Sequence, residues 1–389
     1  MRDFIRGNQL RLLRNGQGYF PALLAAIHAA RQEVFLETYI FELDEVGAEV
    51  ARALMDAAQR GLDVKVQIDG FGAREFPRLW LDKMLHAGVK LLFFRPEIGR
   101  FLFDRTRLRR LHRKLVVIDG EIGFVGGINI ISDYNQQPIR LAPRYDYAVE
   151  VRGPVVRRMH ATVDHMWRQT AWVRIKPEWR KKSRLRPSGK SAGTTLARFV
   201  TRDNLRHRRS IEVEYLDAIE NARHEIIIAN AYFLPGLRFR HALMRASGRG
   251  VRVTLLLQGL IDHAILHFAT RGYYHQFLSA GIEIHEYREG FMHAKVAVID
   301  GRWSTVGSSN IDPFSLLLAR EANLFVHDIA FAAILRADLL RVLQECATQV
   351  RLADLDHAKP IQRLLPWACF GIVRLLMGIS GYGGSHYLE

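Results

Sequence analysis

Cysteine and long apolar runs are scarce in this chain of 389 residues. Its two cysteines, Cys346 and Cys369, are too few for a disulfide framework or a zinc site built from cysteines, and a reducing compartment is the simplest expectation. The apolar stretch at 364–373 is about half of the ~18–20 residues that a transmembrane helix needs. The first six residues carry three charges, and no apolar run follows them that could form a signal peptide. We therefore expect a protein that is made in the cytosol, is not exported and does not span a bilayer.

Acidic side chains are in short supply. The 56 Lys and Arg residues exceed the 40 Asp and Glu residues, which leaves a net charge of +16 and an isoelectric point near 10.1. A field of this sign attracts anionic partners, and nucleic acid, an acidic membrane surface or a phosphorylated small molecule would each satisfy it. The apolar share of 49% is ample for packed cores, and the length predicts two or three domains.

An internal repeat organises the chain. Three pairs of similar segments recur in the same order: 30–36 and 222–228, 53–66 and 242–253, and 87–90 and 280–283. The first pair is typical of a helix that leads into a buried strand, and the second of a helix, a glycine stop and a strand. The third pair leads into a further strand in each copy. The sequence therefore predicts two βαβ-rich halves.

A stretch rich in Lys, Arg, Pro, Gly and Ser separates the two copies and has no apolar periodicity. We interpret it as an exposed linker. It is either a solvated loop without a role of its own or a contact for lipid head groups or nucleic acid. The expected organisation is an N-terminal half at 1–175, the basic linker at 176–195, a C-terminal half at 196–352 and an apolar, basic tail at 353–389.

One discontinuous motif occurs in each half with identical internal spacing. The copies are His112-Arg113-Lys114, Asp119 and Gly126-Gly127-Ile128-Asn129, and then His293-Ala294-Lys295, Asp300 and Gly307-Ser308-Ser309-Asn310. In each copy the His and the Lys are two residues apart before a β-branched run, so they share one face of a strand. The run ends at Asp-Gly, a hairpin signal, and a second apolar segment returns the chain to the Asn. We expect the His, Lys and Asn of each copy to converge.

This set of side chains suits a phosphodiester. Lysine ammonium groups and asparagine amides can hold the non-bridging oxygens without a metal. One imidazole can attack phosphorus while the other protonates the departing oxygen, because the unperturbed pKa of histidine lies near neutral pH. The duplication thus allows two histidines to divide the work.

Acidic residues near the motifs have different expected roles. A carboxylate can fix the tautomer of each imidazole, and Asp146 after the first motif and Glu321 after the second are suitably placed. The alternative for each is a strand-end charge or a surface ion pair, and Glu150 is the rival to Asp146. For Asp119 and Asp300, which stand at hairpin turns, we favour a structural role over direct catalysis.

The two motifs resemble the signature of the phospholipase D superfamily, HxK, four residues, Asp, six residues and G[GS]xN, which occurs twice in one chain. The resemblance implies an α/β fold of two similar halves, each a mixed β-sheet flanked by helices, packed with pseudo-twofold symmetry around one pocket. It implies catalysis without a metal or cofactor, a nucleophilic His112 that forms a phosphohistidine, and His293 as the general acid. The site residues that it implies, together with the acids above, are His112, Lys114, Asn129, His293, Lys295, Asn310, Asp146, Glu321, Asp119 and Asp300.

Within the superfamily the chain is similar to bacterial cardiolipin synthases of the B-like type, which lack two N-terminal transmembrane helices. Strings that carry this likeness include 36–41 (LETYIF) and 306–313 (VGSSNIDP). The likeness implies a phosphatidyltransferase that joins two phosphatidylglycerols into cardiolipin and releases glycerol. It also implies anionic phospholipid partners, phosphatidylglycerol and cardiolipin, and a peripheral location on the cytoplasmic face of the bacterial inner membrane.

Other interpretations stay open. The apolar, basic tail at 364–377 either docks on anionic lipid or packs on the core of the protein. The strand-end aromatics Tyr39, Tyr232 and Phe233 either line an acyl entrance or pack in the core. The rival functions are a phospholipase D-type hydrolase, a nuclease of the same superfamily, against which the tail argues, and a non-catalytic lipid-binding adaptor. The sequence leaves the oligomeric state and the choice between water and an alcohol as acceptor open.

Overall fold

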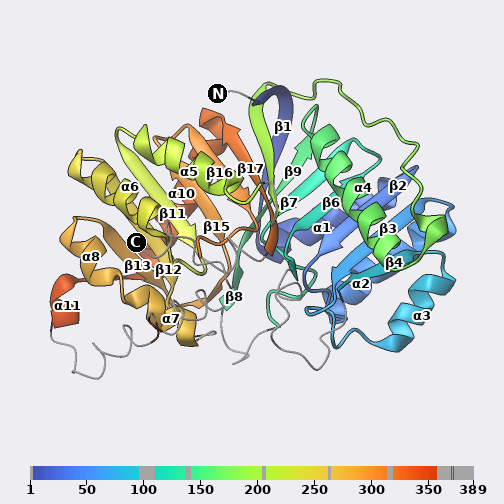
Figure 1. Cartoon of the computed structure of the whole chain (residues 1–389), viewed down its shortest axis with the longest axis horizontal. Coiled ribbons are helices and arrows are strands. Elements are labelled where there is room, and N and C mark those ends of the chain that lie inside the picture. Colours follow the sequence, from blue (N-terminus) through green and yellow to red (C-terminus); the bar gives the residue numbers. More distant parts are fainter. Residues whose placement is uncertain are drawn as a thin grey trace.

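The computed structural model describes most of the chain (Figure 1), namely residues 3–95, 110–135, 142–203, 207–261, 264–312 and 319–356, together with 369 and 371. Each of the ten predicted site residues lies within these ranges. The predicted lipid-binding tail at 364–377 lies outside them except for two residues. No helix in these ranges is both long and apolar enough to cross a membrane.

The N-terminal half alternates strands and helices, as its repeat pattern predicts. Its elements are β1 (Ile5–Arg14), α1 (Asn15–Ala29), β2 (Glu33–Thr38), α2 (Glu45–Gln59), β3 (Asp63–Asp69), α3 (Arg78–His86), β4 (Lys90–Phe94), β5 (Arg110–Leu111), β6 (Lys114–Ile118), β7 (Ile122–Gly126), β8 (Ala142–Tyr145), β9 (Tyr147–Arg152) and α4 (Val156–Val173). Helix α2 illustrates the local signals: the Asp44 carboxylate caps its first turn by accepting from the backbone N–H of Gly47 at 3.0 Å, and Val50 and Leu54 bury one face.

The C-terminal half repeats this order. Its elements, with the short turn that precedes them, are η1 (Pro177–Trp179), β10 (Thr195–Arg202), α5 (Ser210–Glu220), β11 (Glu225–Asn230), α6 (Leu237–Gly248), β12 (Arg252–Gln258), α7 (Ala264–Arg271), α8 (Tyr274–Ser279), β13 (Glu283–Tyr287), β14 (Gly290–Met292), β15 (Lys295–Ile299), β16 (Trp303–Gly307), β17 (Ala319–His327), α10 (Ile329–Glu345), β18 (Ala347–Val350) and α11 (Leu352–Asp356).

The strand order is symmetric about the β10–β1 pair. The main sheet runs β18-β13-β12-β11-β15-β16-β17-β10-β1-β9-β7-β6-β2-β3-β4. On either side of the β10–β1 pair the strands correspond one to one, from β17 and β9 outward to β13 and β4, and β18 adds an edge strand to the second half alone. Each half is mixed, because β2, β3 and β4 are parallel whereas β6 is antiparallel to β2. The predicted fold of two similar α/β halves with pseudo-twofold symmetry is confirmed.

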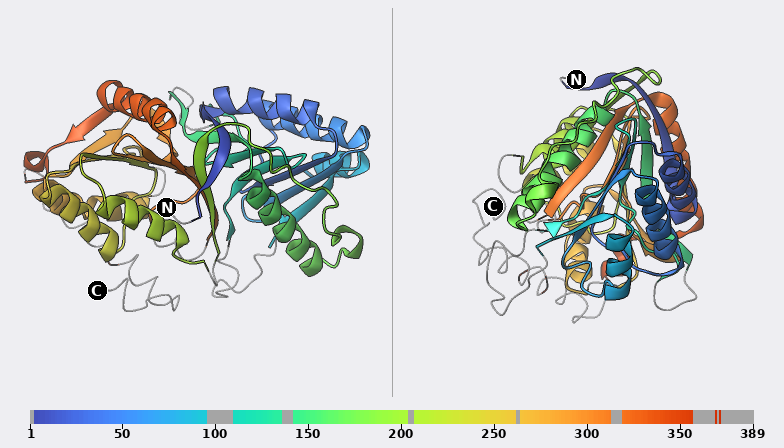
Figure 2. Two further views of the ribbon diagram at one scale, coloured as in Figure 1. Left: turned by 90° about the horizontal axis from the view of Figure 1, so that it is seen from above. Right: turned by 90° about the vertical axis from the view of Figure 1, so that its right-hand side faces the viewer.

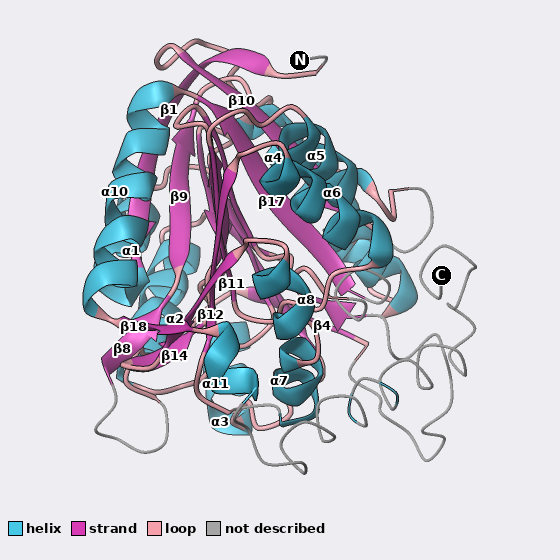
Figure 3. Cartoon of the chain, turned by 90° about the vertical axis from the view of Figure 1, so that its left-hand side faces the viewer, coloured by secondary structure: helices cyan, strands magenta, loops and turns pink. Residues whose placement is uncertain are grey.

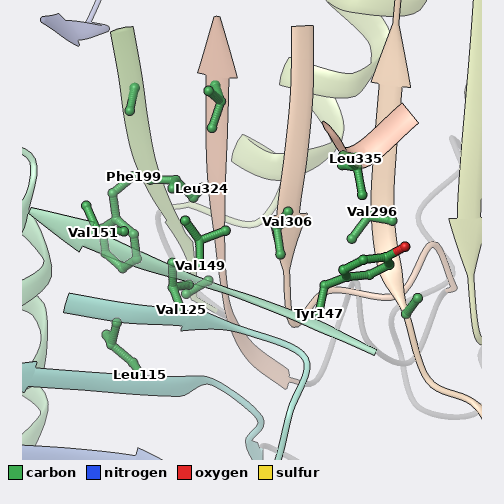
Figure 4. Close-up of a cluster of buried hydrophobic side chains, with 14 of the residues drawn as sticks. Leu115, Val125, Tyr147, Val149, Val151, Phe199, Val296, Val306, Leu324 and Leu335 are labelled. Atoms are coloured by element: carbon green, nitrogen blue, oxygen red, sulfur yellow. The ribbon is translucent and has the colours of Figure 1, made fainter. Parts of the chain in front are cut away.

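The halves are joined in two ways. Strands β1 and β10 pair in antiparallel fashion, with Ile5 opposite Ala197, so the two sheets form one continuous surface. Apolar side chains from both sheets also meet in a shared buried core (Figure 4), which includes Val125 and Val149 from the first half and Val306 from the second. Helices α1, α2 and α10 cover one side of the sheets and α4, α5 and α6 the other (Figures 2 and 3). This packing fixes the two motifs relative to each other.

The basic segment at 176–194 runs along the N-terminal half. None of its residues is buried, as expected of an exposed linker, but it is attached at several points. The Ser183 hydroxyl donates to the Glu33 carboxylate at 2.7 Å, and its backbone N–H donates to Asp164 at 3.0 Å. The indole N–H of Trp167 donates to the carbonyl of Trp179 at 3.0 Å. The segment is therefore held against the first half between α4 and β10.

Candidate active site

Each histidine is held by the backbone of the opposite half. The His112 N–H donates to the carbonyl of Arg320 at 3.0 Å, and the His293 N–H donates to the carbonyl of Tyr145 at 2.8 Å. These bonds continue two short parallel pairings, β5 with β17 and β14 with β8. Arg320 and Tyr145 immediately precede Glu321 and Asp146. The pairing of β5 with β17 therefore brings Glu321 of the second half to His112. The pairing of β14 with β8 brings Asp146 of the first half to His293.

Two imidazole–carboxylate pairs result, and each crosses between the halves. His112 Nδ1 lies 2.9 Å from Glu321 Oε1, and His293 Nδ1 lies 2.7 Å from Asp146 Oδ2. Both carboxylates are buried, whereas the imidazole side chains keep 17% and 20% of their surface exposed. Because each carboxylate occupies Nδ1, the nitrogen that is left for chemistry is Nε2. The rival acid, Glu150, instead pairs with Arg11 on the neighbouring strand β1 and with Arg152 on its own strand.

The two motif lysines are buried beside the histidines. Lys114 Nζ donates to the carbonyl of His112 at 2.8 Å, and Lys295 Nζ donates to the carbonyl of His293. Burial and the positive charge of Lys295 together lower the pKa of Lys114 to about 7, although the charge of Glu321 acts against them. Burial also lowers the pKa of His293. The positive charges of Lys295, Lys114 and His112 lower it in the same direction. The cationic groups of both motifs thus interact within one site, and an anion between them would relieve their repulsion.

The two acids differ in their electrostatics. Burial raises the pKa of Asp146 to about 7, although Lys295 and a bond from the Tyr147 N–H act against it. Burial acts in the same direction on Glu321, but the charge of His112 and the hydrogen bond from the Ser308 hydroxyl leave its pKa below the ordinary value. Glu321 is therefore a carboxylate at neutral pH. Burial lowers the pKa of His112, while Glu321 opposes this shift.

The residues that follow β7 and β16 lie against these two acids. A Cβ on Gly127 would lie 2.3 Å from Asp146 Oδ1, so the short aspartate needs a glycine at this turn. In the second half the matching residue is Ser308, whose hydroxyl donates to Glu321 Oε2 at 2.5 Å and accepts from the Ala322 N–H at 3.0 Å. The motif spacing identifies both positions, but their contacts with the acids were not predicted.

The motif asparagines are buried in the loops that follow β7 and β16. The side-chain oxygen of Asn129 accepts from the backbone N–H of Ile40 at 3.1 Å, which anchors the loop after β2. That loop carries Tyr39, whose ring centroid lies 4.9 Å from that of His112. Asn310 holds the corresponding position in the second half and is 3% exposed. Of the other strand-end aromatics, Phe233 belongs to the core of the second half, as the packing alternative predicts.

The two motif aspartates lie away from the imidazoles, at the far ends of β6 and β15. Asp119 accepts from the backbone N–H groups of 31, 32 and 33 at 2.8 to 2.9 Å, and Asp300 accepts from those of 223, 224 and 225 at 2.8 to 3.0 Å. Both adopt a left-handed backbone, with φ of 52° and 50°. These contacts fasten the hairpin to the start of the neighbouring strand, which agrees with the structural role that we favoured. A part for these two residues in the chemistry stays a prediction.

Within the described ranges no group of three or more His, Cys, Asp or Glu side chains has the arrangement of a metal site. The described side chains offer two oriented imidazoles and two buried lysines, a set of groups that can bind an anion.

Comparison with known proteins gives consistent results. The family described as "Cardiolipin synthase, PLD-like domain" matches residues 23–167 and 215–343. A protein named cardiolipin synthase B from Salmonella typhi is 42% identical over 88% of this chain and 82% of its own length. The protein of that name from Escherichia coli K12 is 38% identical over the same shares. A probable cardiolipin synthase from Bacillus subtilis is 30% identical over 87% of this chain and 66% of its own length.

Solved structures share the fold at low sequence identity. A phosphatidylserine synthase from Haemophilus influenzae superposes with a TM-score of 0.71 over 97% of both chains, at 15% identity. A polyphosphate kinase from Porphyromonas gingivalis superposes with a TM-score of 0.58 over 96% of this chain and 53% of its own, at 16% identity. These two matches bear on the fold alone.

Proposed function

The chain belongs to the phospholipase D-like cardiolipin synthase family, and on that premise we propose that it is a phosphatidyltransferase that makes cardiolipin from two phosphatidylglycerols and releases glycerol. The curated relatives named cardiolipin synthase B, at 38 to 42% identity over most of the chain, support this substrate and product. The observation that carries the proposal is the pair of imidazole–carboxylate contacts that cross between the halves beside two buried lysines. One phosphodiester would fit between these groups.

In the first step His112 Nε2 attacks the phosphorus of a phosphatidylglycerol. The bond from phosphorus to the glycerol oxygen breaks, and His293 gives its proton to that oxygen, so that glycerol leaves and a phosphatidyl–His112 intermediate remains. The anionic state of Glu321 supports this assignment, because a carboxylate at Nδ1 stabilises the positive charge that His112 acquires as it bonds to phosphorus. Lys114 and Lys295 would hold the non-bridging oxygens.

In the second step a hydroxyl of another phosphatidylglycerol loses its proton to His293 and attacks the same phosphorus. The bond to His112 breaks, cardiolipin forms, and both imidazoles return to their starting states. We place the enzyme on the cytoplasmic face of the bacterial inner membrane as a peripheral protein. The net charge of +16 supports attraction to the anionic lipids of that surface.

The test uses purified protein and vesicles of phosphatidylglycerol, with lipid mass spectrometry of the products. The proposal predicts cardiolipin and glycerol in equal amounts from the wild type and neither product from His112→Ala or His293→Ala. His28→Ala removes an exposed histidine on α1 and serves as the control, which retains activity. Cardiolipin formation by both site variants would refute the proposal. Phosphatidic acid without cardiolipin would identify a hydrolase, and cleavage of DNA without a lipid product a nuclease.

A further inference from the structure

The two halves differ at one position beside the imidazoles. In the first half Tyr39 follows β2 directly, and its ring occupies the space next to His112 and lies 5.5 Å from Lys114 Nζ. In the second half the residue that follows the matching strand, β11, is Ala231. The place that corresponds to the aromatic ring beside His112 is thus held in the second half by a methyl group, on a residue bonded to the backbone of Ala294.

A small, partly open pocket lies at this place in the second half. Its polar and aromatic lining includes Tyr232, Gln258, His267, Thr270 and Tyr274, and Ala231 forms part of its wall. Two hydrogen bonds place the pocket against the second motif. The Ala231 N–H donates to the carbonyl of Ala294 at 2.9 Å, and Gln258 Oε1 accepts from the Met292 N–H at 3.1 Å. Met292 and Ala294 are the two neighbours of His293 in the chain.

Gln258 carries a donor that has no protein partner. The matching residue of the first half is Asp69, whose two oxygens accept from the backbone N–H groups of Leu111 and Phe71 at 2.7 and 2.8 Å. Gln258 Oε1 accepts from the Met292 N–H, as Asp69 accepts from the Leu111 N–H. This contact fixes the orientation of the side-chain amide. Its Nε2 is buried without a hydrogen-bond partner in the described part of the chain, and the residue is 7% exposed. A buried donor of this kind is costly unless a ligand accepts from it.

The lining favours a neutral hydroxyl group as that ligand. Gln258 Nε2 can donate to a hydroxyl oxygen. Thr270 Oγ1 already donates to the carbonyl of Leu266 at 2.9 Å and keeps lone pairs that can accept the hydroxyl proton. The remaining walls are apolar or aromatic, with Leu257 and Leu266 among them. The pocket therefore offers a donor from Gln258 and an acceptor from Thr270, beside aromatic and aliphatic walls.

We propose that this pocket binds the hydroxyl group adjacent to the reacting oxygen of glycerol, and so selects a 1,2-diol as leaving group and as acceptor. The proposal rests on the proposed function, in which His293 protonates the departing glycerol oxygen and later deprotonates the incoming one. Both oxygens must then occupy the same position at His293 Nε2. The free glycerol that leaves and the phosphatidylglycerol that enters share a hydroxyl on the carbon next to that oxygen.

The pocket acts in the second step, the transfer to the acceptor. The proton of the incoming hydroxyl passes to His293, its oxygen bonds to phosphorus, and the electron pair of the phosphorus–nitrogen bond returns to His112. An acceptor whose adjacent hydroxyl is bound by Gln258 and Thr270 is oriented for this attack, whereas water or a simple alcohol is not. The pocket thus favours transfer over hydrolysis.

The experiment compares two acceptors that differ by the adjacent hydroxyl alone. Purified enzyme receives phosphatidyl-p-nitrophenol as donor, which releases no glycerol, and either 1,2-propanediol or 1-propanol as acceptor. Mass spectrometry then measures the transfer products and phosphatidic acid. The wild type is expected to prefer the diol. Gln258→Met, which keeps the side-chain length and removes the donor, should lower this preference about 3- to 10-fold, as expected for the loss of one neutral hydrogen bond.

Two further variants complete the test. Ala231→Tyr places the first-half residue in the pocket and should bring the preference for the diol close to 1. Thr270→Val should lower the preference. Thr162→Val is its matched control, because the Thr162 hydroxyl also donates to the carbonyl four residues earlier, at 2.8 Å, but lies on α4 and not in the pocket. A ratio of products from one folded enzyme is insensitive to a general loss of stability, and if Ala231→Tyr does not fold, Gln258→Met and Thr270→Val decide.

The outcomes separate the two proposals. A wild type that makes cardiolipin from phosphatidylglycerol but does not prefer the diol would overturn the pocket assignment alone. The same holds for a preference that Gln258→Met and Thr270→Val leave unchanged. A wild type that makes neither cardiolipin nor a transfer product with either alcohol would instead refute the proposed function.

Discussion

Asp146→Asn is expected to slow the release of glycerol from phosphatidylglycerol and to spare the release of a leaving group that needs no proton. Asp146 lies 2.7 Å from His293 Nδ1, and above its pKa of about 7 it is a carboxylate that stabilises the protonated ring. A hydrogen bond to a charged group contributes about 1.5–3 kcal/mol. Its loss at about pH 8 should therefore slow the first step about 10- to 150-fold.

The assay measures the first turnover with two donors by rapid mixing. Phosphatidylglycerol releases glycerol, which His293 must protonate, whereas phosphatidyl-p-nitrophenol releases nitrophenolate, which leaves as an anion. Asp146→Asn should show the slow step with the first donor and a nearly normal burst with the second. Glu321→Gln acts on the attacking His112 and should slow the burst with both donors. Glu121→Gln changes an exposed acid near the first motif and is the control.

The result also tests the pairing between halves. Asp146 belongs to the first half and His293 to the second, so a change in one half is expected to impair the proton donor of the other. Equal slowing with both donors in Asp146→Asn, together with a loss confined to phosphatidylglycerol in Glu321→Gln, would mean that the two histidines have the opposite roles. Normal rates with both donors in both variants would refute the role of the carboxylates altogether.

Three further predictions concern the surroundings of the site. Gly127→Ala places a Cβ 2.3 Å from Asp146 Oδ1 and should displace this carboxylate, so the same two donors should give the pattern of Asp146→Asn. Asp338→Asn weakens the hydrogen bond that the Tyr147 hydroxyl donates at 2.6 Å and should lower the free energy of unfolding by about 1.5–3 kcal/mol, measured as the midpoint of urea unfolding. Burial alone would raise the pKa of Asp300, but three backbone N–H bonds lower it overall, so its stabilisation is present above about pH 4 and is lost as the pH falls through the lower folded pKa. Asp300→Asn should therefore melt below the wild type at neutral pH, and the gap between the two melting temperatures should close in acid.

Much of the fold could be predicted from local signals. The β-branched runs after Lys114 and Lys295 form strands β6 and β15, and the Asp-Gly pairs that end them form turns with a left-handed residue. The repeat of these signals predicts two similar halves, because each copy needs the same neighbours to bury its strands. These elements depend on short stretches of sequence, which is why the sequence alone identifies them.

The pairing of acids and histidines could not be predicted in this way. The sequence places Asp146 after the first motif and Glu321 after the second, and proximity along the chain would pair each with its own histidine. The observed exchange follows from the pairings of β5 with β17 and of β14 with β8, which exist only when the halves pack together. The difference between Tyr39 and Ala231 could not be interpreted from the sequence either, because the ring contact of Tyr39 with His112 and the pocket at Ala231 appear only in the folded chain.

In the proposed reaction His112 bonds to phosphorus while His293, from the other half, transfers the proton. His293→Ala mixed with phosphatidyl-p-nitrophenol tests it most directly, because the first step then needs no acid and the second lacks its base. We expect a burst of nitrophenolate and a trapped phosphatidyl group, located by peptide mass spectrometry on His112. A group on any other residue, or a burst that leaves no group on the chain, would contradict it.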